Sequence, residues 1–149
     1  MGGRRKRLKR LSAASSKQQP SPNVFFIERN LGRHAIAEAL RNVGESVRVH
    51  DDHLNQDVAD EEWIELVGRN GWLAITKDRN IRYRSWELEA IKKHKAKVFV
   101  VRAKDLTAQG IAEILLKARA RIKRHAKKTT PPFIAAIYRD GSVKAYPLT

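Results

Sequence analysis

Short apolar runs alternate with helix-like segments along the chain from residue 24 onward. The runs at 24–27, 72–76 and 98–101 are unbroken, which is typical of strands that are covered on both faces. Residues 46–50 alternate between polar and apolar side chains, which predicts a further strand. Four segments carry apolar residues at helical spacing, namely 31–43, 60–69, 85–94 and 107–125. This order of elements predicts an α/β fold with a mostly parallel central sheet.

The last part of the sequence predicts a β-hairpin. Pro131-Pro132 interrupts the chain, and two strand-like segments, 133–138 and 142–146, then flank Arg139-Asp140-Gly141. Asp-Gly between two such segments is a strong hairpin signal. We therefore expect the sheet to end in an antiparallel pair.

Residues 1–22 differ in composition from the rest of the chain. They are basic and then rich in Ser, Gln and Pro, and they contain few large apolar groups. Such a segment cannot bury enough surface to offset the entropy of ordering. We expect a basic disordered tail over 1–22 and one folded domain over 23–149. The tail either holds nucleic acid loosely through its charges or is a solvated arm or an over-extended start.

The charge of the chain is strongly positive and unevenly spread. Lys and Arg number 31 against 16 Asp and Glu, a formal net charge of +15. Nucleic acid is the leading polyanionic partner, ahead of an anionic membrane surface or an acidic protein. Residues 117–128 hold seven basic residues, and residues 51–65 hold seven acids without Lys or Arg. The basic segment predicts either a second phosphate-binding face or the polar side of an amphipathic helix.

Several classes of site are excluded or disfavoured by composition. The chain has no cysteine, which excludes disulfides, zinc–thiolate sites and a Cys nucleophile, and suits a cytoplasmic location. No apolar run approaches the length of a membrane span, so we expect no membrane association. The five histidines are scattered, and none has the spacing of a metal ligand or a catalytic triad.

Three acidic residues stand where such a sheet would bring them together. Glu28 and Asp78 follow two of the unbroken apolar runs, and Asp60 opens a helix after the alternating strand. Ligands of parallel sheets bind outside the carboxyl ends of the strands. Hard divalent cations prefer carboxylate oxygens, and they assist phosphodiester hydrolysis. The sequence therefore predicts a Mg²⁺ or Mn²⁺ site at Glu28, Asp60 and Asp78 in a protein that handles a polyanion.

Neighbouring residues extend this candidate site. Glu61, Asp57 and Asp51, in that order, are candidates for a fourth acid, and Asn30 could add a neutral oxygen. Basic residues close to the acids are expected to bind the RNA backbone, namely Arg29, Lys77, Arg79, Arg82 and Arg84.

Each of these positions also has a purely structural interpretation. Asp60 suits a helix N-cap, Asp78 suits a turn, and the basic residues suit a solvated loop. Trp72 and Trp86 are expected in the core rather than as stacking platforms for bases.

Three segments resemble the PIN-like domains of VapC-type toxins: NVFFIERNL at 23–31, DVADEEWI at 57–64 and WLAITKDR at 72–79. The resemblance covers about residues 23–147. It implies a three-layer α/β/α sandwich, a metal-dependent endoribonuclease, an antitoxin partner and homodimers. By the same resemblance Asp60 and Asp78 match acidic metal ligands. Glu28 stands where the family usually has Asp, and Asn80 stands where the wider family often has a further acid.

The leading hypothesis is thus a Mg²⁺- or Mn²⁺-dependent endoribonuclease, the toxin of a toxin–antitoxin pair. It would hydrolyse RNA phosphodiesters with a metal-activated water. The alternative is a catalytically silent PIN-like module that binds nucleic acid or an antitoxin. That module would bind RNA with a steep salt dependence and without a divalent metal.

Overall fold

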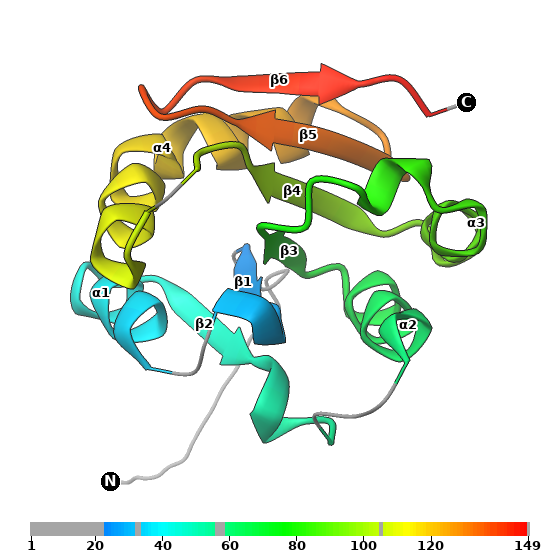
Figure 1. Ribbon diagram of the computed structural model, residues 1–149, viewed down its shortest axis with the longest axis horizontal. Coiled ribbons are helices and arrows are strands. Elements are labelled where there is room, and N and C mark those ends of the chain that lie inside the picture. The colour runs from blue at the N-terminus through cyan, green and yellow to red at the C-terminus, as the bar shows by residue number, and fades with distance from the viewer. Residues whose placement is uncertain (1–22, 32–33, 56–58, 105, 149) are drawn as a thin grey trace, which may run out of the picture.

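A computed structural model describes residues 23–31, 34–55, 59–104 and 106–148 of the chain (Figure 1). The predicted tail, residues 1–22, lies outside the described residues. The strands are β1 (Val24–Ile27), β2 (Ser46–Val49), β3 (Leu73–Thr76), β4 (Lys97–Val101), β5 (Phe133–Ile137) and β6 (Val143–Tyr146). The helices are α1 (Ala35–Asn42), α2 (Asp60–Asn70), α3 (Ser85–His94) and α4 (Ala108–Lys128). Of these helices, none is both long and apolar enough to cross a membrane.

The six strands form one sheet in the order β2-β1-β3-β4-β5-β6. The first five are parallel, and β6 pairs with β5 in the antiparallel direction. The predicted α/β class, the mostly parallel sheet and the C-terminal hairpin are therefore confirmed. From β1 the chain proceeds to β2 on one side and returns to place β3 on the other. The strand order thus reverses between β1 and β3, which is where parallel sheets bind ligands.

Helices cover both faces of the sheet, as the three-layer sandwich predicts (Figure 1). Side chains alternate along each strand, so Phe25 and Ile27 pack with α1 and α4 while Phe26 packs with α2 and α3. By the same alternation Glu28 and Thr76 belong to the α2–α3 face. At the carboxyl ends of β1 and β3, the residues on the α2–α3 face are therefore polar rather than apolar.

Two predicted helices differ in their bounds. The helix expected over 31–43 begins at Ala35. Leu31 belongs instead to a short 3-10 helix, Arg29–Leu31, and its N–H donates a hydrogen bond to the carbonyl of Glu28. The helix expected to end near His125 continues to Lys128. Its last turn carries cations, which the negative end of the helix dipole favours.

Helices α2 and α3 pack unusually closely at Gly68. A Cβ at that position would lie 2.2 Å from the carbonyl oxygen of His94, so any larger residue would force the helices apart. Both helices run in the same direction between parallel strands. Their first turns, which carry Asp60 and Glu87, consequently lie at the same edge of the sheet as the ends of β1 and β3.

Candidate metal centre

An acidic cluster lies at the carboxyl ends of β1 and β3, on the face covered by α2 and α3. One carboxylate oxygen from each of Asp60, Asp78 and Glu87 lies within 4.8 Å of the others. Asp60 and Glu87 also stand in the first turns of two helices, where the positive dipole ends favour negative charge. Three convergent carboxylates at this spacing could hold one hard divalent cation.

Asp60 does not cap its helix. Ala59 is the N-cap residue, and Asp60 is the first helical residue. Its Oδ1 accepts hydrogen bonds from Nη2 of Arg29 at 3.1 Å and from Nε1 of Trp63 at 3.2 Å. The N-cap interpretation of Asp60 is therefore wrong, since the carboxylate is directed into the cluster by two side-chain donors.

Asp78 combines the two roles that its sequence position suggests. Its Oδ1 accepts the backbone N–H of Asn80 at 3.1 Å, which closes the turn after β3. Its Oδ2 accepts from Nη1 of Arg84 at 2.5 Å. The turn therefore fixes the orientation of the carboxylate and leaves its second oxygen on the side of Arg84 and Glu87.

Glu28 lies behind the cluster rather than in it. The residue is only 4% exposed, and its Oε1 accepts the hydroxyl of Thr76 at 2.9 Å. Its Oε2 accepts the backbone N–H of Asn30 at 3.3 Å, and Nε of Arg29 lies 3.8 Å away. Burial raises the pKa of Glu28, and the charge of Asp60 adds to that rise. Glu28 is thus close to Asp60 but lies outside the group of three that could share one ion.

Glu87 is the third carboxylate of the group, and it is not among the residues predicted from the sequence. Its side chain is fully buried, and Oε1 accepts from Nη1 of Arg84 at 2.9 Å. The other oxygen, Oε2, has no hydrogen-bond partner among the described residues. A buried carboxylate oxygen without a donor is costly, so it must hold a proton or meet a cation. Oε2 of Glu87 is therefore available as a ligand for a divalent ion, as a metal site requires.

The electrostatics of Glu87 agree with this geometry. Burial, and then the neighbouring Asp60 carboxyl, raise the pKa of Glu87 from 4.5 to about 7 against the opposing effect of Arg84. Arg84 in turn bridges Asp78 and Glu87, and these two hydrogen bonds raise the pKa of its guanidinium. Among the described residues two cations therefore pair with the three carboxylates: Arg84 with Asp78 and Glu87, and Arg29 with Asp60.

Two of the remaining candidate acids, Glu61 and Asp51, can be placed relative to the cluster. Glu61 is exposed on the first turn of α2, and Asp57 lies outside the described residues. Asp51 follows β2, where its carboxylate lies 3.3 Å from Nδ1 of His50 and lines another cavity, with His34 and Arg41. Neither Glu61 nor Asp51 belongs to the group that could share an ion.

The candidate RNA-binding residues divide into exposed and engaged groups. Lys77 and Arg79 are exposed beside Asp78, and the side chain of Asn30 is exposed as well. Arg29 is paired with Asp60. The guanidinium of Arg82 lies over the rings of Tyr146 at 4.0 Å and Tyr83 at 4.6 Å.

Two aromatic side chains next to the cluster face solvent. Trp86 is 53% exposed and Tyr83 is 67% exposed, so the prediction that Trp86 belongs to the core is wrong. Trp86 instead lines an open groove of about 520 Å³ between α2 and α3, with Glu61, Ser85 and Lys93. Trp72, in contrast, is partly buried and stacks on Phe26, with ring centroids 6.0 Å apart.

The chain is similar to a known protein family and to a named relative. The sequence profile of the family described as "PIN like domain" matches residues 23–103, a range that includes Glu28, Asp60, Asp78 and Glu87. The chain is 29% identical over 130 residues to a protein of Mycobacterium tuberculosis named "Putative ribonuclease VapC45". That similarity covers 80% of this chain and 94% of the relative. No solved structure shows significant similarity to the chain.

Proposed function

This chain belongs to the PIN-like domain family, and from that premise we propose that it is a Mg²⁺- or Mn²⁺-dependent endoribonuclease. The observation that carries the proposal is the convergence of Asp60, Asp78 and Glu87, with a buried oxygen of Glu87 left without a donor. The relative's name contains the word ribonuclease, which supports RNA as the substrate. The net charge of +15 supports a polyanionic substrate in the same way.

Asp60, Asp78 and Glu87 would hold the cation directly. When bound, a Mg²⁺ or Mn²⁺ ion supplies water activation and charge neutralisation at the scissile phosphate. The raised pKa of Glu87 favours its protonated form in the free protein, and that proton has to leave before the cluster can bind the ion. Buried surroundings strengthen each of these charge interactions.

Glu28 remains a candidate for catalysis, and we propose that it acts by positioning. Glu28 accepts a hydrogen bond from the Thr76 hydroxyl, and that hydroxyl accepts the backbone N–H of Asp78 at 3.1 Å. Glu28 thereby helps to fix the turn that orients Asp78. The buried negative charge of Glu28 also adds to the field at the cluster.

Basic side chains around the cluster would bind the substrate. Lys77 and Arg79 are exposed beside Asp78, where they can contact phosphates on either side of the scissile bond. Arg84, whose guanidinium bridges two carboxylates of the cluster, would stabilise negative charge that develops at the phosphate.

We propose further that this ribonuclease is the toxin of a toxin–antitoxin pair in the cytoplasm. The printed name of the relative is that of a VapC protein, and the resemblance to VapC-type toxins implies a cognate antitoxin and a homodimer. An antitoxin that blocks the basic and acidic edge of the sheet would silence the enzyme.

One observation favours the catalytically silent alternative. Arg84 bridges Asp78 and Glu87, and a guanidinium in that position can stand in for a metal ion. The two functions differ in a simple assay. If purified protein with Mn²⁺ cleaves no RNA, and Asp78→Asn leaves cellular toxicity unchanged, the ribonuclease proposal fails and the silent module stands.

A further inference from the structure

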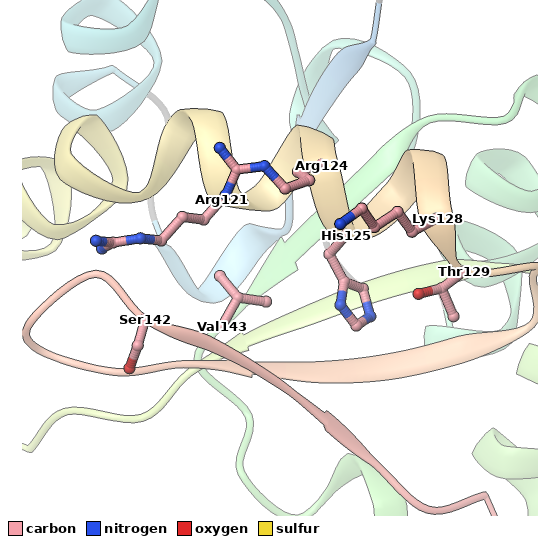
Figure 2. Close-up of a pocket in the computed structure, with 7 residues that line it drawn as sticks. All are labelled: Arg121, Arg124, His125, Lys128, Thr129, Ser142 and Val143. Atoms are coloured by element: carbon pink, nitrogen blue, oxygen red, sulfur yellow. The ribbon is translucent and has the colours of Figure 1, made fainter.

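A cavity lined by basic side chains lies on the face of the sheet opposite the acidic cluster. A cavity of about 390 Å³ separates α4 from the C-terminal hairpin, and Figure 2 shows the side chains that line it. Its lining comes from the last three turns of α4 and from the start of β6, namely Arg121, Arg124, His125, Lys128, Thr129, Ser142 and Val143. Because α4 covers the face opposite α2 and α3, this cavity is distinct from the acidic cluster.

The cations of α4 divide into two sets by their position on the helix. Arg119 and Lys123 face Glu45, whose Oε2 lies 3.4 Å from Nε of Arg119 and 2.7 Å from Nζ of Lys123. Four others recur at the spacing of a single helical face and lie toward the hairpin, namely Lys117, Arg121, Arg124 and Lys128. A Cβ at Gly141 would meet Nη1 of Arg121 at 3.1 Å and Cγ of Lys117 at 3.2 Å, which places the guanidinium of Arg121 and the stem of Lys117 against the hairpin turn.

This second set has no close ion pair with an acidic side chain within the part of the chain that the structure describes. Arg121 donates to the backbone carbonyl of Asp140 at 3.5 Å, and hydrogen bonds from Ser142, and then the charge of Arg121, lower the pKa of the Asp140 carboxyl. The carboxylate of Asp140 is itself held by the N–H and hydroxyl of Ser142 at 2.9 and 2.7 Å. Arg124 and Lys128 have no ion pair with any described carboxylate. Three cations therefore line one concave surface, and none has a close ion pair with a described carboxylate, which favours an anionic ligand.

The lining also indicates which anion fits. Guanidinium forks match phosphate oxygens, and Thr129 adds a hydroxyl beside them. Val143 is the one apolar residue of the lining, and the other lining residues are basic or polar. The ring of His125 packs against Phe133 at 4.9 Å and Phe99 at 5.9 Å, so no aromatic ring is free to stack on a base. One nitrogen of His125, Nε2, lacks a hydrogen-bond partner among the described residues.

We propose that the cavity between α4 and the hairpin binds backbone phosphates of a nucleic acid, independently of base sequence. The identity of that nucleic acid as RNA rests on the function proposed above. The site would add affinity and hold a strand against the protein while another part of the strand reaches the acidic cluster. It would contribute phosphate contacts but no base readout.

The test is RNA binding by the full chain in the presence of EDTA, which separates binding from cleavage. A labelled single-stranded RNA is titrated by fluorescence anisotropy at several salt concentrations. The test variant carries Arg124→Gln and Lys128→Gln. The control carries Lys127→Gln and Lys144→Gln, which remove the same charge from α4 and β6. Lys127 and Lys144 are exposed and do not line the cavity.

Two lost phosphate contacts should lower the slope of log affinity against log salt by about 1.4. At 0.1 M salt this corresponds to a loss of affinity of roughly tenfold or more. The control pair should change the slope by much less. The inference is overturned if both pairs weaken binding equally, or if the test pair leaves the slope unchanged. It is also overturned if the test pair abolishes binding of a polyglutamate peptide while RNA affinity is kept.

A second measurement remains decisive if the test variant folds poorly. In the wild-type protein, NMR signals of the His125 ring and the Ser142 amide should shift when RNA is added without metal. Unshifted signals at saturating RNA would overturn the inference. Failure here is distinct from failure of the proposed function, because a protein that cleaves RNA can lack this site and a silent protein can possess it.

Discussion

The hydroxyl of Thr76 donates a hydrogen bond of 2.9 Å to Oε1 of Glu28, and both residues are buried at the ends of neighbouring strands. The same hydroxyl oxygen accepts the backbone N–H of Asp78 at 3.1 Å. One side chain thus joins the end of β1 to the turn after β3. Because the sheet reverses its strand order between these two strands, Thr76 secures the place where the acidic cluster is built.

Replacing Thr76 by Val should therefore disturb both fold and site. The variant leaves the carboxylate of Glu28 with one donor fewer in a buried position, which should cost about 1–3 kcal/mol in the free energy of unfolding. Affinity for Mn²⁺ should fall by roughly tenfold, as is typical of residues that act through a ligand. Urea unfolding and calorimetric Mn²⁺ titration measure the two effects. Thr76→Ser keeps the hydroxyl and should restore both; equal losses in Val and Ser variants would speak against this role.

The pKa of Glu87 predicts a pH dependence of stability in the absence of metal. The folded protein raises this pKa from 4.5 to about 7, so the fold favours the protonated carboxyl. The stabilisation is fully present below about pH 4.5 and is lost as the pH rises through about 7. The difference in urea midpoint between wild type and Glu87→Gln should therefore change over this range. A constant difference would show that the carboxyl of Glu87 does not titrate there.

The same proton competes with the metal ion. Below about pH 7 the affinity of the wild-type protein for Mn²⁺ should rise roughly tenfold for each unit of pH, and it should level off above that value. Calorimetric titrations at several pH values provide the measurement. A flat affinity between about pH 5 and pH 8 would exclude Glu87 as a protonated ligand.

Arg84→Gln should separate metal binding from catalysis. Arg84 neutralises Asp78 and Glu87, so its removal leaves more uncompensated negative charge and should raise the affinity for Mn²⁺. The turnover of RNA should nevertheless fall, since a positive group beside the scissile phosphate is lost. Arg69→Gln, which alters an exposed residue at the opposite end of α2 from Asp60, is the control for charge. A variant whose metal affinity and turnover move together in the same direction would contradict this assignment.

Trp86→Ala should weaken substrate binding while the metal centre is unchanged. Stacking of a base on an aromatic side chain contributes about 1–3 kcal/mol, so KM for RNA should rise between roughly fivefold and a hundredfold. Mn²⁺ affinity should stay at the wild-type value, because Trp86 contributes no ligand to the cluster. Trp86→Phe keeps a ring at the same exposed position and should recover most of the loss. An unchanged KM in the Ala variant would show that Trp86 does not contribute to RNA binding.

Much of the fold is predictable from the sequence because local pattern and tertiary environment agree. The helix predicted over 85–94 corresponds to α3, and the strand predicted over 98–101 corresponds to β4. Asp140-Gly141 lies at the turn of the hairpin, as predicted. The order of the strands is not predictable in this way. Alternation indicates a parallel sheet, but which strand lies beside which depends on contacts between segments distant in sequence.

The missing member of the acidic cluster has a specific physical cause. In the segment SWELEAI the apolar residues Trp86, Leu88 and Ile91 suggest the inward face, and a charged residue is expected outside. The structure instead turns Trp86 outward and buries Glu87 beside Leu88 and Ile91. The hydrogen bond from Arg84 and the raised pKa of Glu87 make this burial tolerable, and both depend on contacts that only the fold creates. One signal in the sequence could have suggested Glu87 as a ligand: it is an acid in the first turn of a helix that follows a basic loop.

The central claim is that Asp60, Asp78 and Glu87 hold a divalent ion that RNA cleavage requires. The most direct test is calorimetric Mn²⁺ binding, combined with an RNA cleavage assay, for wild type, Glu87→Gln and Glu61→Gln. Glu61 lies on the same helix as Asp60 but is exposed and outside the cluster. We predict that Glu61→Gln binds Mn²⁺ and cleaves RNA like wild type, whereas Glu87→Gln loses both. Wild-type binding and cleavage in Glu87→Gln would contradict the account.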